Sequence, residues 1–486
     1  MLPYKNLIII KDKSQIPVYK QIAVQFIGLI QEGKLPPGAL LPSTRSLAFD
    51  LQLHRKTITA AYEVLVSEDW IDNLPRKGYI VSKDLPLVRP KTFRQNRSNS
   101  FSGKGVPNFQ KLNPVLPHHF KENKGQIIID DGFPDISLLQ AGVISKQFQK
   151  SLDYFTYRAS LRKPVTEHYN LQTSLCNYLK QTRGFDIETE NVFVTRGAQM
   201  AIYIAASLII RPGDKVIVSD PSYFIANAVF EKLGAQLIPV PVDEEGMCTD
   251  MIEEILKKND IRMMYVIPHH HHPTTVTMSV ERRKHLLHLI NQYDIAVIED
   301  DYDYDFQFKY DPYLPLASDD HGGKIIYIGS LTKVLGTPFR LGYMISTTEF
   351  LEEANKMRRM IDIRGDVIIE EAAANLINNG DLTRHIQRSN KIYAQRCDFL
   401  SKLLFKELND SITFTKPSGG MAIWVKFNPE YSLEKIVNKA EKSGLLFYGS
   451  VYAKGEKPLN AFRFGFASLP EDELSTAVEI LKNSIN

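Results

Sequence analysis

The sequence predicts a chain of two folded parts: a short, mainly helical unit and a larger α/β domain with a mostly parallel sheet. The first 81 residues are predicted to form short helices that end in a turn and a strand, and a polar, basic stretch follows over 82–126. From 127 to 486, short apolar runs alternate with helical segments, which is typical of a parallel sheet. With 486 residues, 43% of them hydrophobic, the chain is long enough for more than one core.

Composition and charge narrow the classes of protein to consider. The three cysteines (Cys176, Cys248 and Cys397) show no CxxC spacing, which argues against a disulfide framework or a cysteine zinc site. No apolar run reaches the roughly 18 residues of a membrane span, and the N-terminus does not resemble a signal peptide. We therefore expect a cytoplasmic protein that does not enter a membrane.

The front of the chain is basic. Residues 1–81 carry 10 Lys/Arg against 7 Asp/Glu, and residues 82–126 carry 9 against 2, so the rest of the chain is acidic. This asymmetry favours a front part that meets a polyanion, although a solvated basic linker would give the same counts.

The helical segments of the front part are spaced like a helix-turn-helix. The first runs from about Pro17 to Gly33, and Ser43 can cap a second. A third, from about Arg55 to Glu68, follows a short turn, so that its first residues would face base edges. Residues 76–81 (RKGYIV) fit a hairpin wing.

These residues closely resemble the GntR-type winged helix. The resemblance rests on PVY at 17–19, GKLPPG at 33–38, LPSTRSLA at 41–48, RKT at 55–57, AYE at 61–63 and GYIV at 78–81. It implies that operator DNA is contacted by Arg45, Arg55 and Thr57, and by Lys77 and Gly78 in the wing. His54 stands where the family usually has a small hydroxyl residue. A winged helix used only for protein contact is the alternative.

The back part carries a lysine at the end of a strand. Ser330, Lys333 and Arg340 follow the apolar strand KIIYIG at 324–329. In a parallel sheet, ligands bind at the carboxyl ends of the strands. There the lysine could form a Schiff base with a carbonyl cofactor, and the arginine and serine could bind a phosphate. Taken alone, Lys333 could equally be a surface lysine.

Three further strand ends fit the same cofactor. Asp300 ends the strand IAVIED at 295–300, where a buried carboxylate would keep a pyridine nitrogen protonated. Residues 195–199 (TRGAQ) lie between a strand and a helix, so their amides could bind a phosphate. Tyr223, just after the strand KVIVSD at 215–220, could stack on a pyridine ring.

Residues 127–486 resemble the fold-type I aminotransferases, and together with the front module the chain is similar to the MocR family of regulators. The resemblance implies pyridoxal 5'-phosphate (PLP) as cofactor, Lys333 as its Schiff-base (aldimine) lysine and Asp300 as partner of the pyridine nitrogen. It implies that Tyr302 bonds the phenolic oxygen and that Tyr223 stacks on the ring. The remaining implied contacts are the phosphate ligands Gly197, Ala198, Gln199, Ser330 and Arg340, and Arg463 as the residue that binds an amino acid carboxylate.

The loop 268–277 (PHHHHPTTVT) departs from that family, because it lacks the asparagine that bonds the cofactor oxygen. His271 or His272 could take its place. The four histidines at 269–272 also suggest a metal, but adjacent side chains on an extended segment point to opposite faces and cannot all bind one ion. We expect no metal site.

Three functions remain open. The first is a homodimeric transcriptional regulator that senses PLP, or an amine or amino acid that reacts with it. The second is an active aminotransferase with an accessory DNA-binding domain. The third, a degenerate scaffold, does not explain why Lys333, Asp300, Arg340 and Arg463 occur together. We expect domains at 1–81 and 127–486, with a flexible linker over 82–126.

Overall fold

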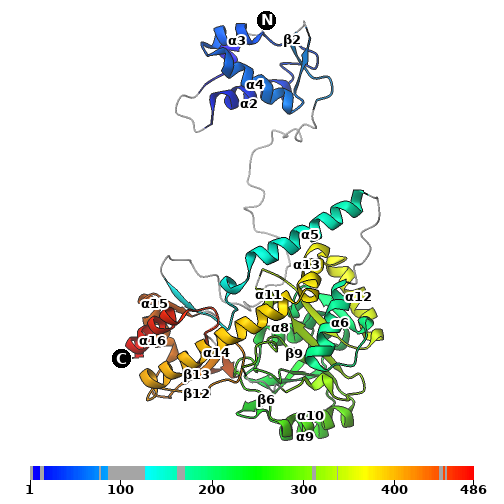
Figure 1. Cartoon of the computed structure of the whole chain (residues 1–486), viewed down its shortest axis with the longest axis vertical. Coiled ribbons are helices and arrows are strands. Elements are labelled where there is room, and N and C mark those ends of the chain that lie inside the picture. The colour runs from blue at the N-terminus through cyan, green and yellow to red at the C-terminus, as the bar shows by residue number, and fades with distance from the viewer. Residues whose placement is uncertain are drawn as a thin grey trace. The chain divides into compact units, whose positions relative to one another are not determined.

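A computed structural model shows two compact units, Met1–Lys111 and Leu112–Asn486 (Figure 1). It describes residues 4–10, 16–75, 78–85, 126–160, 170–308, 313–336, 338–447, 452–454 and 457–485. Almost all of the predicted linker, and the predicted DNA contact Lys77, lie outside these ranges. The predicted domain boundaries at 81 and 126 stay predictions. None of the helices in these ranges has the length and apolarity that crossing a bilayer requires.

The first unit is a winged helix, as predicted. Its elements are α1 (Tyr4–Leu7), α2 (Val18–Gln31), α3 (Thr44–Leu51), α4 (Arg55–Ser67), β1 (Ile71–Leu74) and β2 (Gly78–Val81). The two strands pair antiparallel, with Ile71 opposite Val81. The apolar face expected on the first helix is buried: Ile22, Phe26, Leu29 and Ile30 all pack in the core of this unit.

Side chains at the helix starts explain where α3 and α4 begin. Ser43 accepts a hydrogen bond from the Ser46 amide at 3.1 Å, which is the predicted cap. His54 caps α4 in the same way, because its Nδ1 accepts from the Lys56 amide at 3.2 Å. Between the two helices Gln52 adopts a left-handed conformation with φ of 55°, which makes the tight turn. The helix α4 is therefore capped by a ring nitrogen.

The second unit is built on an eight-stranded sheet. In spatial order the strands are β4 (Val192–Thr195), β11 (Gly342–Ile345), β10 (Ile325–Ser330), β9 (Ala296–Asp301), β8 (Met263–Val266), β5 (Lys215–Asp220), β6 (Gln236–Asp243) and β7 (Gly246–Met247). In the order of this sheet, β11 and β7 run opposite to the other six strands. The sheet is therefore mostly parallel, as predicted.

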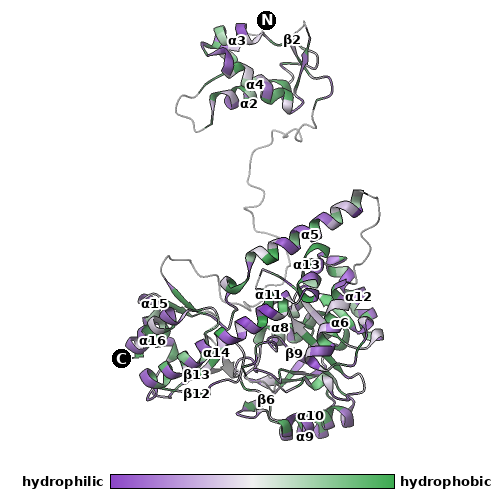
Figure 2. Ribbon diagram, viewed as in Figure 1, coloured by the Kyte–Doolittle hydropathy of each residue, from purple (hydrophilic) through white to green (hydrophobic). Residues whose placement is uncertain are grey.

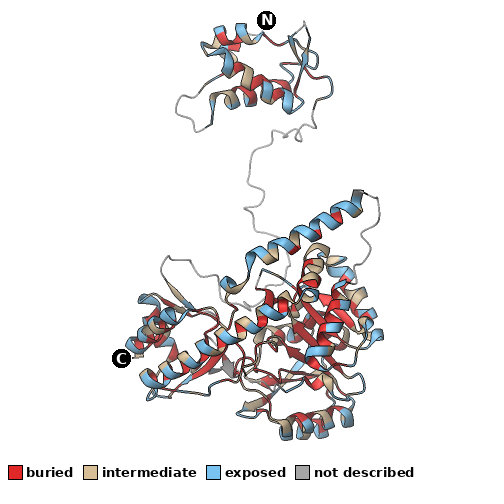
Figure 3. Ribbon diagram, viewed as in Figure 1, coloured by how far each residue is buried: buried red, intermediate tan, exposed pale blue. Residues whose placement is uncertain are grey.

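Both faces of this sheet are covered, because its strands are runs of consecutive apolar residues whose side chains point to the two faces in turn. On β5, Val216 and Val218 pack with α7, α8 and α12, whereas Ile217 packs on the other face with α9 and α10. These helices are α7 (Ala198–Ile209), α8 (Phe224–Lys232), α9 (Thr249–Lys258), α10 (Val280–Tyr293) and α12 (Thr348–Asp362). Figure 3 shows buried residues concentrated at the sheet and exposed residues on the outer helices.

The remaining elements form the outer layer and a C-terminal lobe. The helices are α5 (Ala141–Ser160), α6 (Asn170–Arg183), α11 (Thr332–Leu335), α13 (Val367–Asn378), α14 (Asp381–Leu408), α15 (Leu433–Lys442) and α16 (Glu471–Ile485), with short 3-10 turns at Ile136–Leu138, Thr189–Asn191 and Leu316–Ser318. The strands are β3 (Ile127–Ile129), β12 (Ile412–Phe414), β13 (Ala422–Phe427), β14 (Leu445–Phe447), β15 (Ala453–Lys454), β16 (Lys457–Pro458) and β17 (Ala461–Gly465). Strand β13 is central in an antiparallel sheet with β12 and β17, and β3 pairs parallel with β14.

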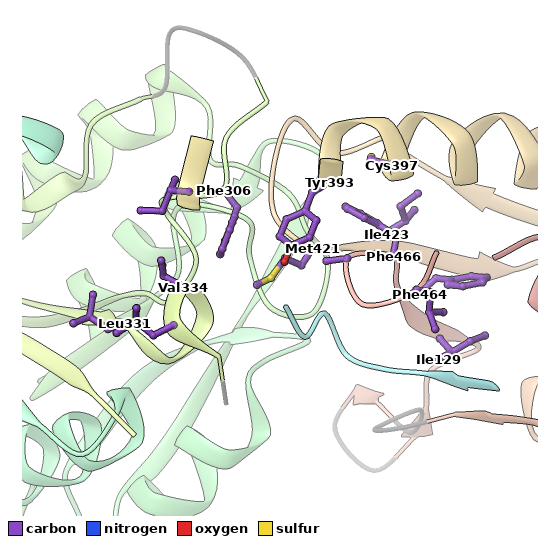
Figure 4. Packing of buried hydrophobic residues seen from close by; sticks show 14 of the residues in the cluster. Ile129, Phe306, Leu331, Val334, Tyr393, Cys397, Met421, Ile423, Phe464 and Phe466 are labelled. Atoms are coloured by element: carbon purple, nitrogen blue, oxygen red, sulfur yellow. The ribbon is translucent and has the colours of Figure 1, made fainter. Parts of the chain in front are cut away.

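One continuous core joins the C-terminal lobe to the large sheet. Leu331 and Val334 belong to the large lobe, and Ile423 and Phe464 to the C-terminal strands, yet all lie in the same buried cluster. Figure 4 shows Tyr393 and Met421 between the two groups. The helices over this core are amphipathic, with hydrophobic and hydrophilic residues both present along α14, α15 and α16 (Figure 2). The position of β17 relative to β9 and β10 is thereby fixed by packing.

Candidate functional site

Strand ends from distant parts of the sequence meet at one edge of the sheet. Strands β9 and β10 are parallel, with Asp300 opposite Ile328. The start of β11 lies between the carboxyl ends of β10 and β4, since Gly342 pairs with both Ser330 and Thr195. Because carboxyl ends of parallel strands share an edge, the residues that follow them gather there.

A cavity of about 260 Å³ opens at this edge. Eight of the ten residues predicted to contact the cofactor or its ligand line it: Ala198, Gln199, Tyr223, Asp300, Tyr302, Ser330, Lys333 and Arg340. Its other lining residues are Asp131, Phe133, Ile202, Phe224, Ile225, Ile267, His272 and Thr332. Most of the residues singled out from the sequence therefore surround one cavity. The role of each residue stays a prediction.

Lys333 lies inside this cavity on the short helix α11. Its Nζ donates to the Gly132 carbonyl at 2.8 Å and lies 4.7 Å from the centre of the Phe133 ring. Burial lowers the pKa of this amine, an effect that nearby Asp131 partly opposes. A lowered pKa raises the fraction of neutral amine, which is the form that attacks a carbonyl.

Asp300 is a buried carboxyl with one unused oxygen. Its Oδ2 accepts from the Tyr265 hydroxyl at 2.6 Å, while Oδ1 is buried without a hydrogen-bond partner. Burial raises the pKa of Asp300 to about 7, and the Tyr265 hydrogen bond works against that rise. An unpaired buried carboxyl oxygen is costly, so this atom is suited to receive a donor from a ligand in the cavity.

The start of α7 and Arg340 form a close-packed corner. Gly197 precedes the helix with φ of 87°, and a Cβ there would lie 3.0 Å from an Arg340 guanidinium nitrogen. A Cβ on Gly342 would lie 2.5 Å from the Gly197 carbonyl carbon. The two glycines therefore let the strand β11 and Arg340 approach the amides at the helix start, where anions are favoured.

Two tyrosines also line the cavity. The Tyr302 hydroxyl donates to the His270 carbonyl at 2.9 Å. Tyr223, just before α8, meets the His272 ring edge-on with 5.0 Å between centres. Both rings line the cavity, where an aromatic ligand could contact them.

Arg463 is close by, but it is not among the residues that line the cavity. It lies on β17, and its side chain is 2% exposed. Its Nε lies 2.9 Å from Asp131 Oδ1, and one of its terminal nitrogens donates to the Pro273 carbonyl at 3.0 Å. The predicted contact of Arg463 with a ligand carboxylate stays a prediction.

The four histidines each have their own partner. His269 and His270 lie beside the Tyr313 carbonyl and Asp303, at 2.7 and 2.9 Å. His271 lies between Thr274 and Ser219, and burial lowers its pKa to about 3. Of the two proposed substitutes for the missing asparagine, only His272 lines the cavity, and its Nε2 is 2.8 Å from Asp131. In the described part of the chain, no cluster of three or more His, Cys, Asp or Glu could hold a metal.

In the winged helix, Arg45, Arg55 and Thr57 lie on the helix-turn-helix of α3 and α4, and Gly78 lies at the start of β2. Arg45 on α3 and Arg55 at the start of α4 are both exposed, and Thr57 is half-buried. The Arg55 Nε donates to Thr44 at 3.2 Å, which links the two helices. Gly78 is exposed and begins β2 with φ of 94°.

Sequence reasoning missed Asp131, Tyr265 and Phe133. The pair of aspartates after the strand 127–129 was a usable signal for Asp131, because it stands just before Gly132 and Pro134, two residue types that are common in turns. Tyr265 lies within an apolar strand and gave no such signal. Its contact with Asp300 arises only because β8 and β9 are neighbours.

Comparison with known families assigns both units. Residues 156–481 match the model "Aminotransferase class I and II", and residues 18–81 match "Bacterial regulatory proteins, gntR family". The larger match covers about two thirds of the chain.

Two regulators are similar to this chain over most of its length. An uncharacterised HTH-type transcriptional regulator, YdeL of Bacillus subtilis, is 26% identical over 96% of both chains. The probable rhizopine catabolism regulatory protein MocR of Rhizobium meliloti is 24% identical over 91% of this chain and 88% of its own. Among solved structures, Pyrococcus horikoshii kynurenine aminotransferase in complex with PMP matches 74% of this chain and 90% of its own, with a TM-score of 0.68 and 26% identity. The chain therefore belongs to the class I and II aminotransferase family and, with its gntR-family winged helix in front, has the MocR-type architecture of transcriptional regulators.

Proposed function

We propose that this protein is a PLP-dependent transcriptional regulator, which senses the cofactor or an amine or amino acid that reacts with it. The observation that carries the proposal is the convergence of Lys333, Asp300 and Arg340 on one cavity in a chain that also has a gntR-family module. Neither half alone would support it.

The residues present fit PLP. The unpaired Asp300 Oδ1 suits the pyridine nitrogen, and the corner of Gly197, Arg340 and Ser330 suits the phosphate. Tyr223 would stack on the ring and Tyr302 would bond the phenolic oxygen. The solved kynurenine aminotransferase named above contains PMP, which supports the same assignment.

PLP would supply an aldehyde that condenses with a primary amine, losing water, next to a ring that accepts electrons. Residues of this chain would supply the nucleophile and position the proton. Lys333 presents a buried amine whose lowered pKa favours the neutral nucleophile. Asp300 would hold a proton at the ring nitrogen, and Tyr265 would orient Asp300 through its hydroxyl, which donates to Oδ2 at 2.6 Å.

DNA binding would be performed by the winged helix. Arg45, Arg55 and Thr57 would contact operator DNA, with Lys77 and Gly78 in the wing. A homodimer would present two such modules to paired half-sites. The exposed apolar side chains of Met360, Ile361 and Ile363 at the end of α12 support a partner subunit there. As a DNA-binding regulator the protein would act in the cytoplasm.

The alternative is an active aminotransferase with an accessory DNA-binding domain. The buried Lys333 amine favours it, because the same lysine could move a proton during turnover.

Absorbance of the full-length protein with PLP, before and after adding a panel of amines and amino acids, separates the two. A Lys333-dependent band that shifts with a ligand, without accumulation of a keto acid, supports the regulator. Catalytic accumulation of a keto acid would favour the enzyme. If no band forms, the cofactor proposal is wrong. Lys324→Ala is the matched control, since Lys324 lies just before the other end of β10 and contacts Asn291 and Asp294.

A further inference from the structure

Asp131 is aimed at the cavity by the turn that follows β3. Its neighbour Asp130 points the other way and accepts from the amides of Gly132 and Phe133, at 2.8 and 2.9 Å. Asp130 also accepts from the Ser468 hydroxyl. The hydrogen bonds of Asp130 therefore stabilise the turn. Asp131, the next residue, lines the cavity together with Lys333.

Three groups hold the Asp131 carboxylate in place. Oδ1 lies 2.9 Å from Arg463 Nε and also accepts from the Tyr452 hydroxyl, while Oδ2 lies 2.8 Å from His272 Nε2. Burial by itself would raise the pKa of Asp131, but His272 and Arg463 outweigh burial and bring it to about 2. The side chain is therefore negatively charged at neutral pH.

Arg463 has its hydrogen-bonding groups engaged by the chain itself. Besides the Asp131 carboxylate, its nitrogens contact the Pro273 carbonyl at 3.0 Å, the Asp131 carbonyl at 3.3 Å and the Tyr302 hydroxyl at 3.5 Å. A Cβ on Gly132 would lie 3.2 Å from one of its terminal nitrogens, so the turn packs directly on the guanidinium. The arginine is covered by Asp131 on the cavity side.

We propose that Asp131 takes the place at Arg463 that a ligand carboxylate would otherwise occupy, so that the site prefers primary amines without an α-carboxylate over the matching amino acids. This inference rests on the proposed function, because it names the class of amine that the same site would accept.

Charge and desolvation carry the preference. An α-carboxylate that reached Arg463 would have to displace Asp131 and then lie beside it, which puts two negative charges next to each other at an arginine whose side chain is only 2% exposed. The displaced Asp131, whose side chain is only 20% exposed, would also lose its ion pair with Arg463, and a largely desolvated charge left without its partner is costly. Lys333 and His272 lie on the same side of the cavity, but each already contacts the turn 131–132. Arg340 lies at the phosphate corner with Gly197. An amine that carries no carboxylate avoids both costs.

The test uses ligand pairs that differ only in the carboxylate, such as phenethylamine with phenylalanine and isopentylamine with leucine. Each is titrated into the full-length, PLP-loaded protein, with calorimetry for affinity and absorbance for the reaction at the cofactor. In the unaltered protein we expect each amine to bind at least tenfold more tightly than its amino acid. In Asp131→Asn, which keeps the shape and removes the charge, this ratio should fall at least tenfold.

Asp135→Asn is the matched control, because it removes a second aspartate–arginine pair from the same segment, with Arg396 at 2.9 Å, but outside the cavity. It should keep the ratio of the unaltered protein. The ratio in the unaltered protein needs no variant, so the test stands even if Asp131→Asn folds poorly.

Equal or tighter binding of the amino acids, with the PLP band present, would overturn this inference and leave the proposed function standing. An unchanged band with both members of every pair would also overturn it. If PLP gives no band at all, the proposed function fails, and this inference fails with it.

Discussion

At the scale of single residues, the site depends on two buried ionisable groups whose pKa values move in opposite directions. Burial lowers the pKa of Lys333 and raises that of Asp300, so both shift toward their neutral forms. A ligand that brings charge of either sign therefore changes the protonation of the cavity. Without a ligand, the buried and ionised Asp300 carboxylate lowers the free energy of unfolding.

That cost predicts how stability depends on pH in the cofactor-free protein. Asp300 has an ordinary pKa of 3.8 and a folded one of about 7, so the folded state binds more protons between these values. Asp300 therefore lowers stability as pH rises from 4 to 7, and the whole penalty is present above 7. Asp300→Asn should gain stability relative to the unaltered protein over that window, by up to about 4 kcal/mol.

Urea unfolding at pH 4, 5, 6, 7 and 8 measures this difference. Glu299, whose pKa burial also raises to about 7, is present in both proteins and cancels. A difference in unfolding free energy that does not change with pH would contradict the account of Asp300.

Site residues could be predicted from the sequence where they stand at the end of an apolar strand, because that local pattern can be recognised without knowing the fold. Lys333, Asp300 and Tyr223 each follow an apolar run, and the structure places all three around one cavity. Asp131 and Arg463 could not be paired in this way, because they are 332 positions apart and meet only when β3 and β17 pack together. Side-chain partners across such distances follow from packing, which single motifs do not encode.

At the scale of elements, the helix starts of the winged helix are determined by local side chains. Ser43 and His54 each accept a hydrogen bond from an amide in the first turn of the helix that they cap. Since capping acts over a few residues, the boundaries of α3 and α4 could be predicted closely. The antiparallel position of β11 could not, because it depends on its pairing with β4 and β10.

The cap at position 54 gives a prediction for α4. His54→Ala should cost about 1 kcal/mol of local stability, because the Lys56 amide loses its acceptor, whereas His54→Ser should keep most of it. Hydrogen exchange in a peptide from the start of α4 measures this. Exchange about fivefold faster in the alanine variant, and near the original rate in the serine variant, is expected. Equal exchange in all three proteins would show that the cap contributes nothing.

Arg55 gives a prediction for the same helix. Arg55→Ala should weaken operator binding by about ten- to a hundredfold, as expected for loss of an arginine contact to a base edge or phosphate. The absorbance with PLP should stay unchanged. Binding is measured by fluorescence anisotropy of labelled DNA.

Lys34→Ala is the control for the Arg55 variant. It removes one positive charge from the module at an exposed site already paired with Glu32, so a smaller loss of DNA binding is expected. Equal loss of DNA and cofactor binding would contradict separate roles for the two units.

At the scale of the whole molecule, the sequence indicated two units with different partners. The basic front matches a gntR-family module, and the rest matches class I and II aminotransferases. Fold class followed from the alternation of strands and helices, since that pattern suits few architectures. What the ligand does to DNA binding does not follow from either unit alone, because it requires that the ligand favour one state of the chain over another.

The measurement that tests the central claim most directly is the affinity of the full-length protein for its operator DNA with PLP, with and without a reactive amine. Lys333→Ala is measured alongside. We expect the amine to change DNA affinity at least fivefold in the unaltered protein, a typical coupling between sites, and to have no effect in Lys333→Ala. DNA affinity that is the same in all conditions, while PLP is bound through Lys333, would contradict the claim that this site regulates DNA binding.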